Sequence, residues 1–270
     1  GGQINATDGA DGDYERQVFM GRPENLRVEN GVVVLELRAD QAQGVGWTDR
    51  YGNVNDLHTS AIMASRTDAG SAKPSFSRHS RVEFRAKIPH EAGVWPALWM
   101  CGTTGDWPGC GEFDVLEYWG RGATDEFGYT STNNIHWEGV VNWHSENMQY
   151  YAMRRPSDAF HIWAMERDDE KILMFYDDQL VAWHDITAAD QSELRDRDGY
   201  VIINFCYTGT DPAMDRVQMQ VDYVREYFFK PGVRRHYPPV VGLGGNRDTG
   251  EMIEAYVNQP LPLVGAATGD

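Results

Sequence analysis

Apolar and polar residues alternate with a period of two along much of the chain, a pattern typical of β-strands with one buried face. The clearest case is residues 81–88, where one set of alternate positions is apolar (Val82, Phe84, Ala86, Ile88) and the other is charged (Arg81, Glu83, Arg85, Lys87). Residues 33–37 and 217–223 alternate in the same way, and residues 172–183 predict a hairpin around the turn Asp177-Asp178. Residues 201–205 predict a buried strand.

Helical patterns are weak by comparison. The best helical window, residues 187–198, is almost wholly polar and lacks an apolar stripe, so we expect a loop with one turn. Many short strands with turns about every 8–12 residues predict an all-β fold, a sandwich or barrel of antiparallel strands. We expect one domain over residues 1–230. A Pro- and Gly-rich extension over residues 231–270 is expected to wrap that domain or to be partly disordered.

The charge balance narrows the choice of partners. The 270 residues include 24 basic and 41 acidic side chains, a net charge of −17. Such a charge repels phosphate, so neither nucleic acid nor an anionic membrane surface is an expected partner. No apolar run approaches the roughly 20 residues that a membrane span needs. The chain opens on Gly1 without a leader, so we expect an exported protein, extracellular or periplasmic, with its signal peptide removed, and a monomer.

Three carboxylates close together in the chain, Glu112, Asp114 and Glu117, are the clearest candidate chemistry. In a regular strand the first two share a face, and Glu117, five residues beyond Glu112, points to the other face. A β-bulge at residues 115–116 adds one position and brings all three to one face. Their mutual repulsion there favours a raised pKa for one of them, as a general acid at neutral pH requires. An exposed acidic face or a calcium site remains an alternative.

Indole rings surround these acids in the sequence, at Trp95, Trp99, Trp107 and Trp119. Paired carboxylates beside indoles suit sugars, whose C–H faces stack on aromatic rings while their hydroxyls bond to acids. The spacing therefore favours glycosidase chemistry.

The three cysteines show no zinc-like spacing with each other or with histidine. Cys101 and Cys110 are nine positions apart and could form a bridge, which would leave Cys206 unpaired.

Together these motifs resemble glycoside hydrolase family 16, and within it the bacterial laminarinase-like endo-β-glucanases. The family's Glu-x-Asp-x-x-Glu signature corresponds to Glu112, Asp114 and Glu117. Its upstream text, G-x-W-P-A-x-W-M and then W-P-x-C-G-E, corresponds to residues 93–100 and 107–112. Further matches extend the resemblance from about residue 13 to residue 228.

The resemblance implies a jelly-roll β-sandwich of two antiparallel sheets with a concave substrate cleft. It also implies a retaining double displacement, in which Glu112 attacks the anomeric carbon and Glu117 protonates the leaving oxygen and later deprotonates water. Asp114 would hydrogen-bond the nucleophile and tune its charge. Retention needs the two working carboxyl groups roughly 5–5.5 Å apart, so both Glu side chains are expected to lean inward over Asp114.

Sugar contacts are also implied by the resemblance. The expected substrate-binding residues are Trp95, Trp99, Arg85 and His136, with Trp107 and Trp137 over the cleft. Phe205 and Tyr207 are bulkier than the family pattern at their positions, and we expect them to reshape a subsite. No cofactor is required for the reaction. The family often binds one structural calcium through an acid that matches Asp222.

The sequence thus predicts an enzyme that cuts β-1,3 or mixed β-1,3/1,4 glucan. One alternative keeps the chemistry but changes the polymer to agar, porphyran or carrageenan, and a sulfated polymer would need basic residues in the cleft. The arginines that could bind such sulfate groups are Arg66, Arg78, Arg121, Arg154 and Arg155. A second alternative is a non-catalytic glucan-binding protein, a class that typically loses the carboxylates present here.

Overall fold

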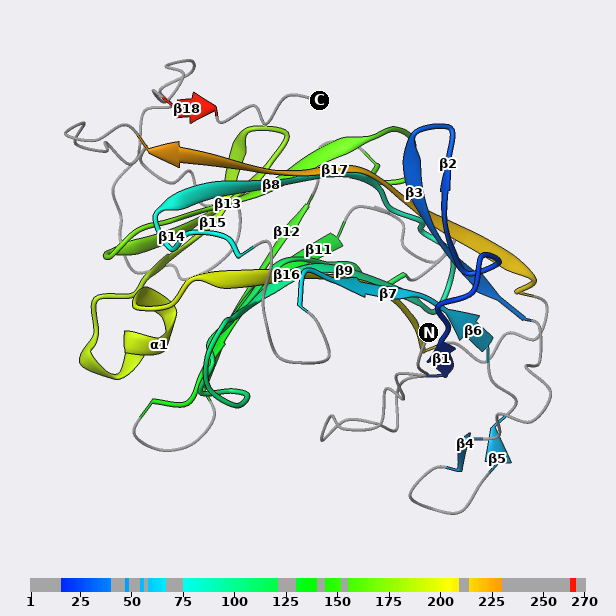
Figure 1. The fold of residues 1–270 in the computed structure, drawn as a ribbon, viewed down its shortest axis with the longest axis horizontal. Helices are drawn as coiled ribbons and strands as arrows, with labels where there is room; N and C mark the ends of the chain where they lie inside the picture. Colours follow the sequence, from blue (N-terminus) through cyan, green and yellow to red (C-terminus); the bar gives the residue numbers. More distant parts are fainter. Residues whose placement is uncertain are drawn as a thin grey trace.

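Two β-sheets stacked face to face make up the described part of the computed structural model (Figure 1). It describes residues 16–39, 47–48, 54–55, 58–66, 75–120, 130–139, 144–151, 155–208, 214–229 and 263–265. The first sheet has ten strands. Its main path runs β1 (Gln17–Phe19), β6 (His58–Ser60), β3 (Val32–Arg38), β17 (Arg216–Phe229), β8 (Ser80–Lys87), β13 (His161–Arg167), β14 (Lys171–Tyr176) and β15 (Gln179–Asp185), with β2 (Leu26–Glu29) beside β3 and β18 (Leu263–Gly265) beside β17.

The second sheet has six strands and holds the acidic motif. Its order is β12 (His144–Tyr151), β11 (Thr130–Trp137), β10 (Glu112–Glu117), β9 (Val94–Gly102), β16 (Gly199–Tyr207) and β7 (Ile62–Ala64). A separate pair is formed by β4 (Trp47–Thr48) and β5 (Val54–Asn55). Neighbouring strands of the two large sheets are antiparallel, except that β1 runs parallel to β6. The antiparallel sandwich expected from the period-two alternation is therefore confirmed.

The hairpin and the helical turn also agree with the sequence. Between β14 and β15, Asp177 and Asp178 adopt φ values of 46° and 63°. Two consecutive residues with positive φ are typical of a type I′ hairpin turn, which asparagine and aspartate tolerate. The polar window at residues 187–198 forms a short 3₁₀ turn, η2 (Ala189–Gln191), and one helical turn, α1 (Ser192–Arg195). Among the described residues, no helix has both the length and the apolar composition to cross a membrane.

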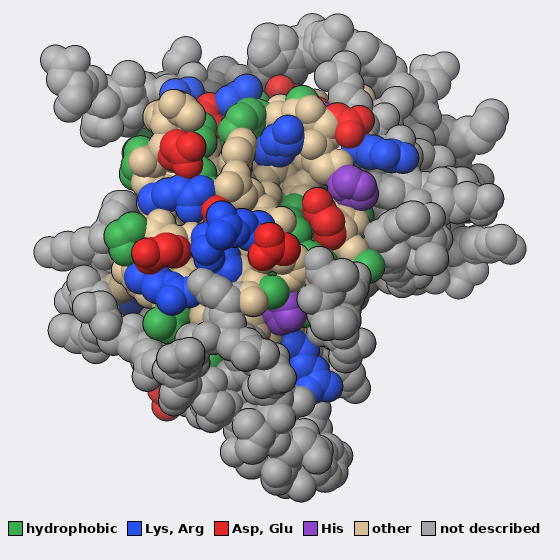
Figure 2. Space-filling model, turned by 90° about the vertical axis from the view of Figure 1, so that its right-hand side faces the viewer, with side chains coloured by type: hydrophobic (Ala, Val, Ile, Leu, Met, Phe, Trp, Pro, Cys, Tyr) green, Lys and Arg blue, Asp and Glu red, His purple; other side chains and the backbone are tan. Residues whose placement is uncertain are grey.

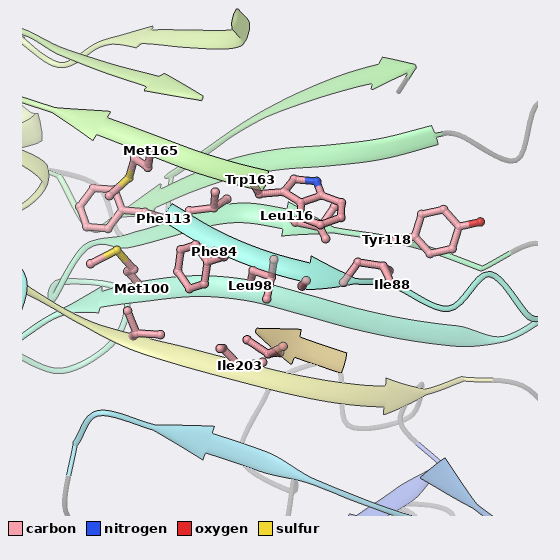
Figure 3. Close-up of a cluster of buried hydrophobic side chains, with 14 of the residues drawn as sticks. Phe84, Ile88, Leu98, Met100, Phe113, Leu116, Tyr118, Trp163, Met165 and Ile203 are labelled. Carbon is pink, nitrogen blue, oxygen red and sulfur yellow. The ribbon is translucent and has the colours of Figure 1, made fainter. Parts of the chain in front are cut away.

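The main core lies between the two sheets (Figure 3). The ten-stranded sheet contributes Phe84 and Trp163, and the six-stranded sheet contributes Leu98, Phe113 and Ile203, all fully buried. Burying this much aromatic and branched surface is the main stabilising contribution to such a sandwich.

Phe205 and Tyr207 are also fully buried members of this core. The expectation that they reshape a sugar subsite is therefore wrong. Their side chains point from β16 toward the opposite sheet, and only the alternate residues of that strand reach the outer face.

Charged side chains interleave on the side of the molecule that holds β2 and β3 (Figure 2). Arg27 lies 2.9 Å from Glu29 and 2.7 Å from Glu36, and Arg38 lies 2.6 Å from the other oxygen of Glu36. Paired charges of this kind are locally neutralised, so they offer little to a charged partner. The net charge of −17 is not expressed as an unbroken acidic patch here.

The C-terminal region is described in one short strand. Within residues 231–270, that strand is β18, which pairs antiparallel with the end of β17 through Phe229 and Leu263. The division into a domain over residues 1–230 and an extension over residues 231–270 stays a prediction.

Candidate active site

A β-bulge interrupts β10 in the middle of the acidic motif. In the pairing with β9, Asp114 lies opposite Trp99 and Leu116 lies opposite Leu98. A step of two residues along β10 therefore corresponds to a step of one residue along β9. Val115 is the extra residue, and both Val115 and Leu116 are fully buried in the core. The bulge expected from the spacing of the acids is therefore confirmed, and it brings Glu117 back to the face of the earlier two.

The bulge is supported from the neighbouring strand. The side-chain amide of Asn133 on β11 donates a 2.6 Å hydrogen bond to the carbonyl oxygen of Val115, and Thr132 Oγ1 donates to the carbonyl oxygen of Glu117 at 3.3 Å. Asn133 is fully buried and in phase with the core residue Ile135. Sequence analysis missed Asn133, although a polar residue at a core position of a strand implies a buried hydrogen-bond partner.

Glu112 has two polar neighbours in the site. The indole Nε1–H of Trp107 donates to Glu112 Oε2 at 2.6 Å. His136, paired with Glu112 in register, places Nε2 3.7 Å from Glu112 Oε1 and 3.3 Å from Asp114 Oδ2. Trp107 is half exposed, whereas His136 and Asp114 are buried. The structure thus brings Trp107 and His136, both expected in the site, to the first two acids.

Glu117 has a separate set of neighbours. Trp95 donates its indole Nε1–H to Glu117 Oε1 at 3.2 Å. The Trp95 ring is stacked on Trp119, with ring centroids 4.0 Å apart and an interplanar angle of 21°. Trp119 is partly exposed. The two terminal acids of the motif are therefore each hydrogen-bonded to a different tryptophan, one at each end of the site.

Burial dominates the electrostatics of the three acids. It raises the pKa of Glu112 well above the usual range, as does the charge of Asp114, while His136 and the Trp107 N–H act in the opposite direction. Burial and the charge of Glu117 raise the pKa of Asp114 well above its usual range. Burial also raises the pKa of Glu117, against the effect of the Trp95 hydrogen bond. The three carboxyl groups therefore keep their protons to higher pH than ordinary carboxyl groups do.

Trp99 lies on the same outer face, on the strand next to the acids. It is partly buried, and its indole Nε1–H donates to Asn204 Oδ1 at 2.6 Å. Asn204 in turn directs its amide to the Cys206 sulfur at 2.9 Å. These contacts from β16 fix the orientation of the ring beside Asp114.

Arg85 does not belong to this site. It lies on β8 in the other sheet, where its guanidinium pairs with Asp222 of β17 and stands 4.9 Å from the Phe160 ring centroid. Because Phe84 and Ala86 point into the core, Arg85 points to the outer face of the ten-stranded sheet, away from Glu112. The expectation that Arg85 contacts sugar near the cleavage point is wrong.

The same pairing bears on the expected calcium site. A calcium ion takes six to eight oxygen ligands, whereas the neighbour of Asp222 in the described part of the chain is a guanidinium cation. The described residues around Asp222 therefore do not fit calcium.

Trp137 is likewise not positioned to meet a sugar. It is a member of the main core and is 8% exposed, because it directly follows His136 on β11 and adjacent strand residues face opposite ways. The expectation that Trp137 lies over the cleft is therefore wrong.

Metal ligation at the acids is geometrically conceivable. Within the described ranges, the one set of candidate ligands close enough for a metal ion comprises Glu112, Asp114 and His136, with ligand atoms within 4.8 Å of one another. Two carboxylates and one imidazole also suit proton transfer and nucleophilic chemistry without a metal. We assign no metal to them.

Comparisons with known proteins agree with this geometry. The sequence model of Glycosyl hydrolases family 16 matches residues 20–225. A beta-glucanase of Rhodothermus marinus is 29% identical over 237 residues, which are 80% of this chain and 75% of that protein. Glucan endo-1,3-beta-glucosidase A1 of Niallia circulans is 28% identical over 236 residues, 80% of this chain but only 32% of that protein.

Among solved structures, SCLam, a non-specific endo-beta-1,3(4)-glucanase from family GH16, is similar to this chain with a TM-score of 0.66 and 26% identity, covering 83% of each chain. The shared sandwich, the intact acidic motif and a family match over most of the chain lead to one conclusion: the chain belongs to glycosyl hydrolases family 16.

Proposed function

We propose that the chain is an endo-acting, retaining β-glucanase that hydrolyses β-1,3 or mixed β-1,3/1,4 linkages by double displacement. The observation that carries this proposal is the bulge, which sets Glu112, Asp114 and Glu117 on one face of the sheet. The relatives named as beta-glucanase and glucan endo-1,3-beta-glucosidase support the substrate class.

Glu112 is the nucleophile in this proposal. Its carboxylate attacks the anomeric carbon and forms a covalent glycosyl-enzyme, which water then hydrolyses. A nucleophile must be ionised, and the hydrogen bond from Trp107 favours the anion. His136, 3.7 Å from the other oxygen, stabilises the same charge.

Asp114 controls the charge of the nucleophile. Burial and the charge of Glu117 raise the pKa of Asp114 well above its usual range, which favours a protonated Asp114 beside the nucleophile. In this proposal the proton is on Asp114 when Glu112 attacks, because the Trp107 N–H favours the anion of Glu112. Asp114 therefore lets two buried acids lie side by side while one of them keeps its charge.

Glu117 is the general acid and base. Its burial raises its pKa, which keeps a proton available for the leaving glycosidic oxygen near neutral pH. After the first step the deprotonated group accepts a proton from the attacking water. The stacked pair Trp95 and Trp119 beside it offers an aromatic surface to a sugar ring.

The roles of the two glutamates can be separated with substrates of different leaving groups. We expect Glu112→Ala to lose activity on both laminarin and an aryl β-glucan oligosaccharide whose phenol leaves without protonation. We expect Glu117→Ala to keep glycosylation of the aryl substrate and to be reactivated by azide, giving a β-glycosyl azide. If Glu112→Ala hydrolyses laminarin as fast as the parent, Glu112 is not the nucleophile.

An anionic polymer is the second candidate, and Arg66 is the observation that favours it. Its guanidinium is exposed, donates to the Tyr200 hydroxyl at 3.2 Å and lies 5.1 Å from the Tyr200 ring centroid. Tyr200 pairs across the sheet with Cys101, which pairs with Glu112. Arg66 thus holds a positive charge beside Tyr200, which is aligned across the strands with Cys101 and Glu112. A sulfate group on the polymer could pair with that charge.

Of the other arginines considered for such a polymer, Arg78 lies 3.6 Å from Asp196, whereas Arg121 and Arg154 lie outside the described residues. Product profiles on laminarin, barley glucan, lichenan, agarose and carrageenan decide between the polymers. Activity confined to a galactan contradicts the glucanase proposal. Binding of laminarin without release of product from the parent points to the glucan-binding alternative.

A further inference from the structure

Two buried cysteines bracket the loop that carries Trp107. Cys101 lies near the end of β9 and Cys110 just before β10, and they are 4% and 5% exposed. Both belong to one small cluster on the outer face of the sheet, and their thiols are hydrogen-bonded to each other. The residues next to them are also joined, since the Gly102 N–H donates to the Gly111 carbonyl oxygen at 3.0 Å.

We propose that Cys101 and Cys110 form a redox-active dithiol, whose oxidation to a disulfide closes the loop that places Trp107 on Glu112. Both cysteines are free thiols in this structure. A bridge between them would enclose the whole loop at the edge of the active site, so the modification would act directly on a contact of Glu112.

The oxidant would be a small-molecule disulfide such as oxidised glutathione. The Cys110 thiolate attacks one sulfur of that disulfide, forms a mixed disulfide and releases one glutathione thiolate. Cys101 then loses its proton to solvent and attacks the Cys110 sulfur, which breaks the mixed disulfide and releases the second glutathione. Two electrons pass from the cysteine pair to the glutathione disulfide.

The environment favours Cys110 as the first attacking group. The hydrogen bond with Cys101 lowers the pKa of Cys110 to about 7, against burial, and the nearby Arg197 and Arg66 act in the same direction as that bond. The same hydrogen bond, together with burial, raises the pKa of Cys101 well above its ordinary value.

In the thiol form the loop depends on weaker contacts. Arg197 donates to the carbonyl oxygens of Thr104 and Gly109, and the Cys110 N–H donates to the Asp106 carbonyl oxygen at 2.8 Å. The bond to Thr104 is exposed, so water competes for it. A covalent bridge would limit loop opening and keep the indole of Trp107 near Glu112.

The third cysteine is a natural control. Cys206 is also buried, but it pairs with Trp95, whereas Cys101 pairs with Tyr200, six positions away on β16. Those six positions correspond to about 20 Å along a strand, so Cys206 cannot reach either member of the pair without unfolding.

The test equilibrates the full chain with oxidised or reduced glutathione, unfolds it in iodoacetamide and maps the alkylated cysteines by mass spectrometry. We expect three alkylated cysteines in the reduced sample and only Cys206 in the oxidised one. Cys206→Ser should keep the bridge, and Cys101→Ser or Cys110→Ser should lose it. Three alkylated cysteines in the oxidised parent, or a bridge that includes Cys206, would overturn the proposal.

A second readout is the unfolding temperature. Closing a loop of about ten residues should raise Tm by roughly 5–10 °C in the oxidised parent and in Cys206→Ser, but not in Cys101→Ser. An equal Tm for the oxidised and reduced parent would show that the bridge does not constrain the loop. The effect on hydrolysis rests on the proposed function, whereas cysteine mapping does not. A mapped bridge in a protein that cleaves no glucan would support the dithiol and contradict the glucanase.

Discussion

Trp107 Nε1–H donates a 2.6 Å hydrogen bond to Glu112 Oε2, although the Trp107 side chain is 51% exposed. An indole in that position is available both to the carboxylate and to a sugar ring. The hydrogen bond opposes the burial that raises the pKa of Glu112. An exposed loop residue thus affects the charge of a largely buried acid.

Replacing Trp107 by Phe should therefore weaken the nucleophile while retaining an aromatic ring. Loss of a hydrogen bond to a charged group that water can partly replace costs on the order of 1.5 kcal/mol, so we expect kcat/KM to fall about tenfold. Because the bond lowers the pKa of Glu112, its removal should move the acidic limb of the pH–rate profile to higher pH. Both effects are measured on laminarin over a range of pH.

Trp183 provides a matched control for this change. It is an exposed indole on β15, in the other sheet, with Lys171 4.9 Å above its ring. Trp183→Phe should leave both kcat/KM and the acidic limb unchanged. If Trp107→Phe behaves like Trp183→Phe, the hydrogen bond does not support the charge of Glu112.

Asn133 gives a prediction about the bulge. Asn133→Ala leaves the buried carbonyl of Val115 without its 2.6 Å donor, which should cost about 1–3 kcal/mol of unfolding free energy. Since the bulge sets the direction of Glu117, activity per folded molecule should also fall. Chemical denaturation gives the first quantity, and kcat measured well below the unfolding transition gives the second.

The control is another buried asparagine far from the acids. Asn25 donates to the Glu36 carbonyl oxygen at 2.9 Å and to Thr59 Oγ1 at 3.0 Å, within the ten-stranded sheet. Asn25→Ala should lose comparable stability but retain kcat. Equal losses of kcat in Asn25→Ala and Asn133→Ala would mean that general destabilisation, and not the bulge, accounts for the effect.

Much of this site could be predicted because it depends on parity along one strand. Five positions separate Glu112 and Glu117, so a shared face demands one extra residue, and Val115 supplies it. The residue that supports the bulge, Asn133, was not predicted. Its strand contains Asn133 and Asn134 in succession, and only knowledge of which one faces the core identifies Asn133.

Two predicted substrate-binding residues, Arg85 and Trp137, lie outside the site, for different physical reasons. The alternation around Arg85 shows that it faces outward but not from which sheet, and a sandwich has two outer faces. The core position of Trp137 could have been predicted, because adjacent residues of a strand point to opposite faces and His136 faces the site. Local periodicity predicts the direction of a side chain, whereas strand order decides which side chains meet.

The pairing of Arg85 with Asp222 leads to a prediction about metal removal. Because a guanidinium already neutralises the Asp222 carboxylate, we expect EDTA to leave both kcat and Tm unchanged. Arg85→Ala should likewise retain kcat, since Arg85 lies on the face opposite Glu112. A fall in Tm with EDTA that calcium reverses would instead place a structural ion in the protein.

Stability should fall as pH rises, because the buried acids prefer their protonated forms. Burial raises the pKa of Asp114 in the folded state, so the folded chain binds more protons than the unfolded one between the ordinary and the raised pKa. The contribution of Asp114 to the free energy of unfolding is therefore fully present below its ordinary pKa of about 3.9. It is lost as the pH rises through the raised pKa of the folded state.

Asp114→Asn removes this dependence while keeping the shape of the side chain. Its Tm should exceed that of the parent at about pH 8 and approach it at about pH 4, where Asp114 is already neutral. Asp185→Asn is the control of opposite sign, because hydrogen bonds from Thr187 lower the pKa of Asp185 and its removal should slightly destabilise the protein above that pKa. Calorimetry across this pH range measures both variants. A lower Tm for Asp114→Asn than for the parent at about pH 8 would show that the Asp114 carboxylate is stabilised, not strained, in its buried position.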